Sequence, residues 1–314
     1  MTLQMNWSRA STLLQRLGSV IGLVLLFIVL SVMSPDFLTT GNLLTVLRQV
    51  SINALIAFGM TFVILAGGID LSVGAILAFT GAITAGLMAA GHGIVLSAGA
   101  GLGLGLILGM VNGALVSWGK VAPFIATLGT LTLLRGLTLS YTQGSPIPVS
   151  NPGFALIGGG YIANLIPLPV IWMFIAFVVC GFLLRGTVFG RHLVAIGGNE
   201  EAARLSGVRI APMKVAIYGL SGLLSAFAGI VLTSRLYSAQ ATAGQGYELD
   251  AIAAVVLGGT SLAGGRGWLF GTLIGALLIG FLNNGLNLLG VSSFYQQVVK
   301  GIVILIAVLL DRRQ

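Results

Sequence analysis

Charged residues are scarce in this sequence of 314 residues: Asp, Glu, Lys and Arg together account for 7%, and only seven residues are acidic. Soluble domains usually contain about 25% charged residues. Because 57% of the residues are hydrophobic, most of the surface has to face lipid instead of water. The composition excludes an ordinary soluble protein and predicts an all-α, polytopic membrane protein.

Residues that carry chemistry are scarce as well. Cys180 is the only cysteine, which excludes a disulfide within the chain and a metal cage built from thiolates. His92 and His192 are too isolated to share a metal ion. The sequence has no H-E-x-x-H motif and no set of serine, histidine and carboxylate with plausible reach. We therefore expect neither a catalytic residue nor a metal site.

The positive charge of the chain does not indicate a nucleic-acid partner. The formal net charge is +8, but Lys and Arg are dispersed among apolar runs and form no basic face. No segment between these runs is long and polar enough to fold as a separate domain. We expect a single membrane domain over residues 1–314, with a first half at 17–184, a cytoplasmic coupling loop at 185–214 and a second half at 215–310.

Apolar runs near the length of a membrane span dominate the chain. Applying the criterion of about 20 apolar residues predicts about ten transmembrane helices, some of them short or broken. The first run follows Arg9 and Arg16 as in a signal peptide, but no small-x-small cleavage site is present, so we expect an uncleaved helix. The runs are Leu17–Met33, Ile52–Gly67, Leu71–Ala90, Ile94–Trp118, Phe124–Tyr141, Leu168–Leu184, Val215–Ser234, Asp250–Leu262, Trp268–Leu289 and Gln297–Leu310.

Basic residues gather at one set of helix ends. If the helices alternate in direction, these residues lie on one side, which the positive-inside rule makes the cytoplasm, and both termini are cytoplasmic. Arg48, Arg235 and Glu248 then fall on the outer side. The basic residues of the inner side are Arg9, Arg16, Lys120, Arg185, Arg191, Arg204, Arg209, Lys214, Arg266, Arg312 and Arg313.

Glycine-rich segments suggest an internal repeat. Gly67–Gly74 aligns with Gly258–Gly265, and each lies at the inner end of a span that runs inward, which predicts two parallel pseudo-repeats. Glycine also recurs at every fourth position within Gly101–Gly113 and Gly267–Gly275. Such spacing lets helix backbones approach closely in lipid, so we interpret these glycines as packing positions and not as a nucleotide site.

A short helix is predicted in the cytoplasmic loop. Asn199 is placed as its N-cap, two glutamates suit its positive end, and Gly207 suits a left-handed stop. Its alanines and leucine alternate with charges, which favours insertion into a protein cleft. From the residues alone, a solvated loop and a knob that docks into a partner remain open. The segment comprises Asn199, Glu200, Glu201, Ala202, Ala203, Arg204, Leu205, Ser206 and Gly207.

Three long motifs in order carry a family resemblance. Gly67–Gly74, Gly190–Gly207 and Tyr247–Gly267 together resemble permeases of the ribose/xylose/arabinose class of ABC importers, and the tail Gly271–Ser293 looks most like the ribose type. The resemblance implies ribose as the cargo. A related pentose, a hexose or a signalling sugar is the alternative.

The resemblance also implies partners. Permeases of this class are homodimers of ten-helix subunits in the bacterial inner membrane, enclosing a central path. A periplasmic sugar-binding protein delivers the cargo, and a cytoplasmic ATPase receives the segment that matches Asn199–Gly207 as its coupling helix. This chain has no G-x-x-x-x-G-K-[ST] motif, so ATP and Mg²⁺ are expected on the ATPase subunit and no cofactor on this chain.

A few polar residues in apolar surroundings are candidates for the path. Asp70 is an intramembrane carboxylate, and its alternatives are a role in the path and a cap for a helix that starts at Leu71. Asn283, Asn284 and Asn287 suit either the path or hydrogen bonds between helices.

Three arginines and the rarity of buried acids complete the sequence picture. Arg135 lies inside the fifth predicted span, where we expect it to pair or to reach the surface in a structural role. Arg48 and Arg235 are rare basic residues on the outer side and are expected to dock the binding protein. A secondary transporter coupled to protons or sodium is the alternative class, for which Asp70 is the only candidate ion ligand.

Overall fold

The computed structural model describes residues 4–311, and the side chains of residues 18–306, 308 and 309. Within residues 4–311 the chain forms thirteen α-helices and four two-residue strands. The elements are α1 (Gln4–Met33), α2 (Thr40–Leu65), α3 (Val73–Ala89), α4 (Ile94–Ser117), α5 (Pro123–Thr142), β1 (Ile147–Pro148), α6 (Pro152–Gly159), β2 (Tyr161–Ile162), β3 (Ile166–Pro167), α7 (Leu168–Gly186), α8 (Val188–Gly198), α9 (Glu200–Leu205), α10 (Ile210–Leu236), β4 (Ser238–Ala239), α11 (Tyr247–Leu257), α12 (Leu269–Leu288) and α13 (Ser293–Asp311).

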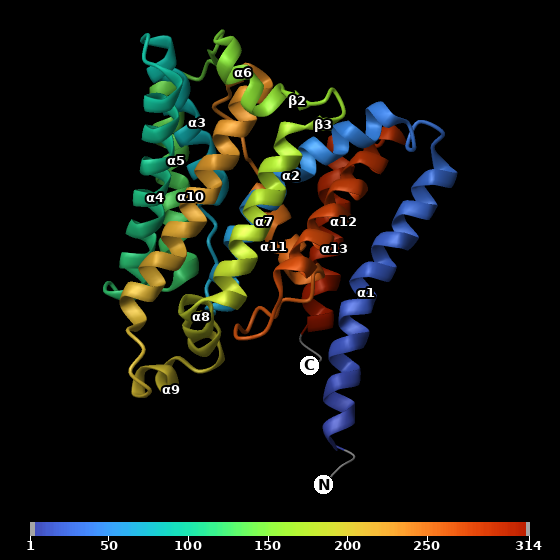
Figure 1. The fold of residues 1–314 in the computed structure, drawn as a ribbon, viewed down its shortest axis with the longest axis vertical. Coiled ribbons are helices and arrows are strands. Elements are labelled where there is room, and N and C mark those ends of the chain that lie inside the picture. The colour runs from blue at the N-terminus through green and yellow to red at the C-terminus, as the bar shows by residue number, and fades with distance from the viewer. Residues whose placement is uncertain (1–3, 312–314) are drawn as a thin grey trace.

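The helices form one bundle whose two ends differ in character. Helices α3, α4, α5 and α10 stand on one side, α2 runs through the centre, and α11, α12 and α13 lie beside α1 on the other side (Figure 1). One end carries α8 and α9, together with the beginning of α1 and the end of α13 (Figure 1). The opposite end carries α6, β2 and β3 (Figure 1). Antiparallel pairing joins β1 to β4 and β2 to β3.

The core of the bundle is built around α2 and α10. Both are buried along most of their length because they are apolar on all sides, as a helix surrounded by other helices has to be. Helices α4, α5 and α7 instead expose many large apolar side chains, for example Ile107, Leu133 and Phe174. Such surfaces suit contact with lipid.

Six helices of the described chain are long and apolar enough to cross a membrane: α2, α4, α5, α7, α10 and α12. Shorter apolar helices cover Gly18–Met33, Val73–Ala89 and Ser293–Ile306. Each of the ten predicted runs coincides with a helix, although α11 has only 11 residues. The prediction of a polytopic, mostly helical membrane protein is confirmed.

The glycines of α4 sit where its backbone meets α10. A Cβ on Gly105 or Gly109 would overlap Ala226 or the carbonyl of Tyr218 in α10. A Cβ on Gly113 would lie 2.6 Å from the Cα atom of Val215. The interpretation of these glycines as packing positions is confirmed.

The two glycine-rich turns share one local geometry. Two residues after the last residue of α2 and of α11 the chain has a glycine with positive φ, Gly67 at +78° and Gly259 at +84°. The Gly67 N–H donates to the Ile64 carbonyl and the Gly259 N–H donates to the Val256 carbonyl, both at 2.9 Å. In local geometry Gly67 therefore corresponds to Gly259, one residue after the Gly258 with which the sequence aligned it. The two turns match because each helix needs a left-handed residue at the same distance from its end.

An ion pair fixes α13 to the bundle. The ammonium of Lys300 lies 3.0 Å from Asp250 Oδ2 in α11, and the Asp250 side chain is 5% exposed. A carboxylate this deeply buried needs such a partner. The pair therefore ties the last described helix to the short helix α11.

Candidate coupling surface and translocation path

Helix α9 forms as the sequence predicts. Asn199 Oδ1 accepts a hydrogen bond from the Ala202 N–H at 2.9 Å and caps the helix. Arg204 donates to both carboxylate oxygens of Glu201, at 2.5 and 3.0 Å, and this contact lowers the pKa of the Glu201 carboxyl below its usual value. Gly207 follows with φ +87°. The predicted N-cap, charge placement and left-handed stop are all confirmed.

The apolar side chains of α9 do not all point outward. Leu205 is 78% exposed, but Ala203 is only 5% exposed. The expectation that Ala203 inserts into a partner's cleft is therefore wrong, because this chain already covers it. A salt bridge of 2.7 Å between Glu200 and Lys214 also ties α9 to α10. The surface left free for a partner includes Leu205, Ala202 and the exposed Glu201–Arg204 pair.

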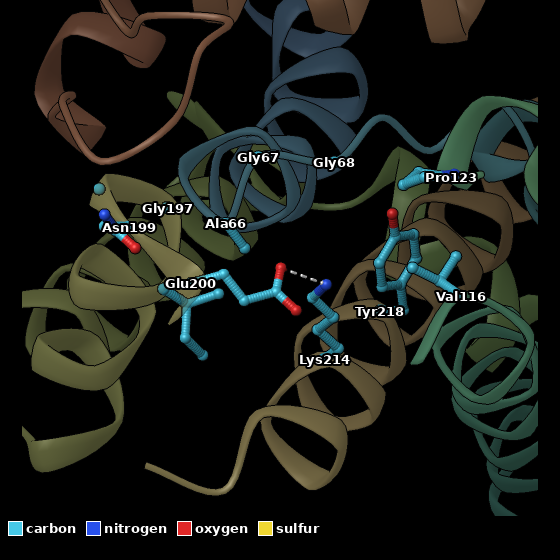
Figure 2. A pocket seen from close by; sticks show the side chains of 12 residues that line it. Ala66, Gly67, Gly68, Val116, Pro123, Gly197, Asn199, Glu200, Lys214 and Tyr218 are labelled. Carbon is cyan, nitrogen blue, oxygen red and sulfur yellow. Dashed lines mark hydrogen bonds and ion pairs between the residues drawn. The ribbon is translucent and has the colours of Figure 1, made fainter. Parts of the chain in front are cut away.

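A pocket of about 270 Å³ lies between the end of α2, the junction of α8 and α9, and the first turns of α10 (Figure 2). The Glu200–Lys214 salt bridge lies across it, and Tyr218 stands beside Pro123 on the far side (Figure 2). The Tyr218 hydroxyl is buried and has no hydrogen-bond partner among the described residues. The pocket therefore lies between the start of α9 and the end of α2.

Beside this pocket three backbone segments touch directly. The Gly265 N–H donates to the Leu65 carbonyl at 2.9 Å. A Cβ on Gly197, in the last turn of α8, would overlap the same carbonyl. A Cβ on Gly264 would lie 3.0 Å from the Gly67 nitrogen. The end of α8 therefore rests on the end of α2 and on the loop after α11 with no side chain between, and we call Leu65, Gly67, Gly197, Gly264 and Gly265 the backbone junction.

Asp70 lies in a buried polar network. Its Oδ1 accepts from the N–H and the hydroxyl of Ser72, at 3.0 and 2.6 Å, and its Oδ2 accepts from the Ser221 hydroxyl at 2.9 Å. Asn112 donates to the Ser72 hydroxyl at 2.8 Å and accepts from Thr130 at 2.6 Å. The network joins the turn after α2 to α10, α4 and α5.

This burial decides between the alternatives for Asp70. Its side chain is fully buried, so the expectation that it lines a path is not supported. The cap prediction is also wrong in detail, because α3 begins at Val73 with Ser72 as its N-cap, and not at Leu71. Asp70 instead holds the segment that precedes this helix.

Two of the three asparagines of α12 make hydrogen bonds between helices. Asn284 and Asn42 of α2 exchange reciprocal amide hydrogen bonds of 2.7 and 3.0 Å. Asn287 accepts from Gln296 of α13 at 2.8 Å. Asn283 Oδ1 is buried and has no hydrogen-bond partner in the described part of the chain. The structure thus supports helix packing for Asn284 and Asn287 and leaves the role of Asn283 open.

Arg48 and Arg235 come together at the end of the bundle opposite α9. The Arg48 guanidinium lies 4.6 Å from the ring centroid of Tyr161 in β2. The two arginines are close enough to repel each other electrostatically. Arg48 Nε is buried and lacks a hydrogen-bond partner among the residues described. Two cations on one surface form a local positive field that favours an acidic partner.

Arg135 and Glu248 lie near each other, although the sequence predicted Arg135 inside a span and Glu248 on the outer side. Arg135 donates to the Ala243 carbonyl at 2.5 Å and interacts electrostatically with Glu248. Glu248 Oε2 lies 2.6 Å from where a Cβ on Gly74 would be, at the second residue of α3. The placement of Glu248 on the outer side is therefore wrong. The sequence prediction assumed that each span crosses the whole membrane before the next one begins. In the structure the segment between β4 and α11 instead runs inward to the start of α3.

Sequence reasoning missed the backbone junction. The pairs Gly197-Gly198 and Gly264-Gly265 were visible, but a glycine pair does not reveal which backbone it approaches. The predicted positions Arg9, Arg16, Arg312 and Arg313 have side chains outside the described residues.

The chain is similar in sequence to known transport proteins. Residues 42–308 match the family described as branched-chain amino acid transport system / permease component. The chain is 62% identical to the ribose import permease protein of Bacillus subtilis, over 96% of this chain and 94% of the relative. It is 54% identical to that of Haemophilus influenzae (93% and 92% covered) and 52% identical to that of Escherichia coli K12 (94% and 93% covered). No solved structure gave a significant match.

Proposed function

This chain belongs to the family of branched-chain amino acid transport system permease components, and from that premise we propose that it is the permease subunit of an ATP-driven ABC importer that moves ribose from the periplasm to the cytoplasm. The observation that carries the proposal is identity of 52% to 62% with ribose import permeases over more than nine-tenths of the chain. As a permease component, the chain lies in the inner membrane and is not itself an enzyme. A permease for another pentose, a hexose or a signalling sugar is the alternative.

The importer needs partners that this chain does not replace. A cytoplasmic ATPase subunit binds ATP and Mg²⁺, and a periplasmic binding protein selects and delivers the sugar. A second copy of the chain completes a homodimer. The absence of a phosphate-binding loop motif from the sequence supports the separate ATPase.

Helix α9 is the proposed contact with the ATPase. Its support is a capped helix at the end of the bundle that also holds α8, with an exposed Leu205 and an exposed ion pair (Figure 1). Arg48 and Arg235, at the opposite end, are the proposed contact with the binding protein. The proposal also includes about ten spans in two parallel pseudo-repeats, one membrane domain and cytoplasmic termini.

A secondary transporter coupled to protons or sodium is the competing function. Asp70 was its only candidate ion ligand, and its carboxylate is already occupied by Ser72 and Ser221. An ABC importer moves sugar at the expense of ATP, whereas a secondary transporter relies on an ion gradient.

Uptake of labelled ribose separates the two functions. Membrane vesicles should contain the permease with its ATPase and the ribose-loaded binding protein. We expect uptake that needs ATP, stops with vanadate and continues with an uncoupler. Uptake that stops with the uncoupler alone, or no ribose uptake at all, would overturn the proposed function.

A further inference from the structure

We infer that Arg135 of α5 and Glu248 of α11 form a contact point for the sugar inside the translocation path, which we call the sugar station. This inference rests on the proposed function and deepens it. It assigns path-contacting residues that differ from the asparagines and from Asp70.

The station lies far from both ends of the bundle. Glu248 packs against Gly74 at the start of α3, and the turn just before α3 is held by Ser221, near the middle of the 27-residue helix α10. Arg135 is likewise in the interior of the 20-residue helix α5. Both charges are therefore placed within the depth of the membrane, where exposure to lipid is costly.

The station is nevertheless open at the surface of the single subunit. Arg135 and Glu248 are both partly exposed, and the neighbouring Thr132, Gly136 and Gln245 are exposed. Charged and amide groups at this depth face a water-filled path or a protein, because lipid cannot hydrate them. The station and its exposed polar neighbours Thr132 and Gln245 together mark the side of the subunit that faces the path.

The chemistry of the two groups suits a neutral sugar with adjacent hydroxyls. Arg135 uses one N–H for the Ala243 carbonyl, and its guanidinium has five N–H donors in a fixed fork. Glu248 Oε1 accepts a long hydrogen bond of 3.3 Å from the Gly246 N–H, and Glu248 Oε2 is buried and has no hydrogen-bond partner among the described residues. The remaining N–H donors of Arg135 can donate to a hydroxyl oxygen, and the Glu248 carboxylate can accept from a hydroxyl hydrogen. With only two such groups, binding is weak enough for release.

The position of the station is fixed by its surroundings. Backbone contact between Gly74 and Gly244 holds the segment before α11 against α3. Thr130, on the same helix as Arg135, is anchored to the Asp70 network through Asn112. A sugar passing between α5 and α11 would therefore meet both groups in a constant arrangement.

Accessibility of introduced cysteines tests whether this surface faces water. Thr132→Cys and Gln245→Cys are compared with Val178→Cys, which replaces a 51% exposed residue of α7. The native Cys180 is buried, so its background should be low. In the assembled importer, we expect a charged methanethiosulfonate reagent to label the first two cysteines and leave the third unlabelled. Labelling of the first two no faster than that of Val178→Cys would overturn the inference.

Uptake kinetics test whether the sugar contacts the two charges. We expect Arg135→Gln and Glu248→Gln each to lower ribose uptake by about tenfold or more, the loss expected for a charge-assisted hydrogen bond. Recovery of the ATPase with the permease, and ATP hydrolysis stimulated by the loaded binding protein, should stay near the wild-type level. A purely structural defect would lower these two measurements as well.

The outcomes distinguish this inference from the proposed function. Normal ribose uptake by both glutamine variants, or equal loss of uptake and ATPase recovery, would overturn the sugar station while the wild-type importer still takes up ribose. Failure of the wild-type importer to take up ribose would instead overturn the proposed function.

Discussion

The Gly265 N–H donates a hydrogen bond of 2.9 Å to the Leu65 carbonyl, and this bond joins the loop after α11 to the end of α2. Gly197 lies so close to the same carbonyl that a methyl group would not fit. The residues are far apart in sequence, yet their backbones meet next to α9. A displacement of α9 therefore reaches two helix ends in different halves of the chain without passing through a flexible side chain.

Gly197→Ala should strongly reduce uptake. The added methyl group overlaps the Leu65 carbonyl and has to push α8 away from α2, and overpacking of this kind costs about 1–3 kcal/mol. The measurements are ribose uptake in vesicles and thermal unfolding in detergent. Gly198→Ala is the matched control, because nothing lies within 4 Å of its added methyl group. Equal effects of the two substitutions would show that the close contact at Gly197 has no role.

Leu205→Asp should weaken binding of the ATPase without unfolding the permease. Leu205 is 78% exposed, so a charge there costs little in the free subunit and is unfavourable in an apolar cleft. We expect at least about a tenfold loss of ATPase recovered by co-purification, equivalent to about 1.4 kcal/mol. Full recovery with normal uptake would show that α9 is only a solvated loop.

Ala203→Arg should behave differently. Because Ala203 is 5% exposed and covered by its own chain, an arginine there should lower expression and thermal stability as well as uptake. Selective loss of ATPase recovery with an unchanged unfolding temperature would mean that Ala203 meets the partner after all.

Asn42 and Asn284 should be energetically coupled. Each single replacement by alanine removes the reciprocal amide hydrogen bonds between the two side chains. The loss of unfolding free energy in the double variant should therefore be smaller than the sum of the losses in the two single variants. Coupling energies between membrane helices average about 0.6 kcal/mol and reach about 1.7 kcal/mol. A cycle of unfolding measurements in detergent gives the value, and strict additivity would contradict the prediction.

Lys300→Met should destabilise the subunit by about 3–5 kcal/mol, because Asp250 then remains buried without its partner. Adding Asp250→Leu should restore much of the loss, since no buried charge is left. Unfolding of the two variants under the same conditions provides the test. A double variant less stable than Lys300→Met would assign Asp250 a further role.

Reversing the charge at both Arg48 and Arg235 should raise the concentration of loaded binding protein needed for half-maximal uptake. The two arginines reinforce each other's positive field at the end of the bundle opposite α9, and the change replaces attraction by repulsion. Uptake measured at several binding-protein concentrations reveals the shift, which should shrink at high salt. Unchanged kinetics would remove this surface from the docking site.

Local features were predictable because they depend on neighbours in sequence. The cap at Asn199 and the stop at Gly207 involve residues within one helical turn, and the glycines of α4 follow the helical period. Ala203 was misplaced because a helix of six residues has too few turns to show which face is buried. Glu248 was misplaced because its depth depends on the long-range backbone contact between Gly244 and Gly74, for which the sequence carries no local signal.

The glycine contacts between α4 and α10 have a mechanical consequence. With no side chains at the closest points, the backbones of α4 and α10 would collide at Gly105 or Gly109 if the helices slid past each other. The two helices therefore move as one rigid unit. Helix α10 is about 40 Å long from its 27 residues. Lys214, near one end, is tied to α9, and Arg235 is in the last turn at the other end. A small rotation imposed at Lys214 is therefore delivered across the whole thickness of the membrane to Arg235.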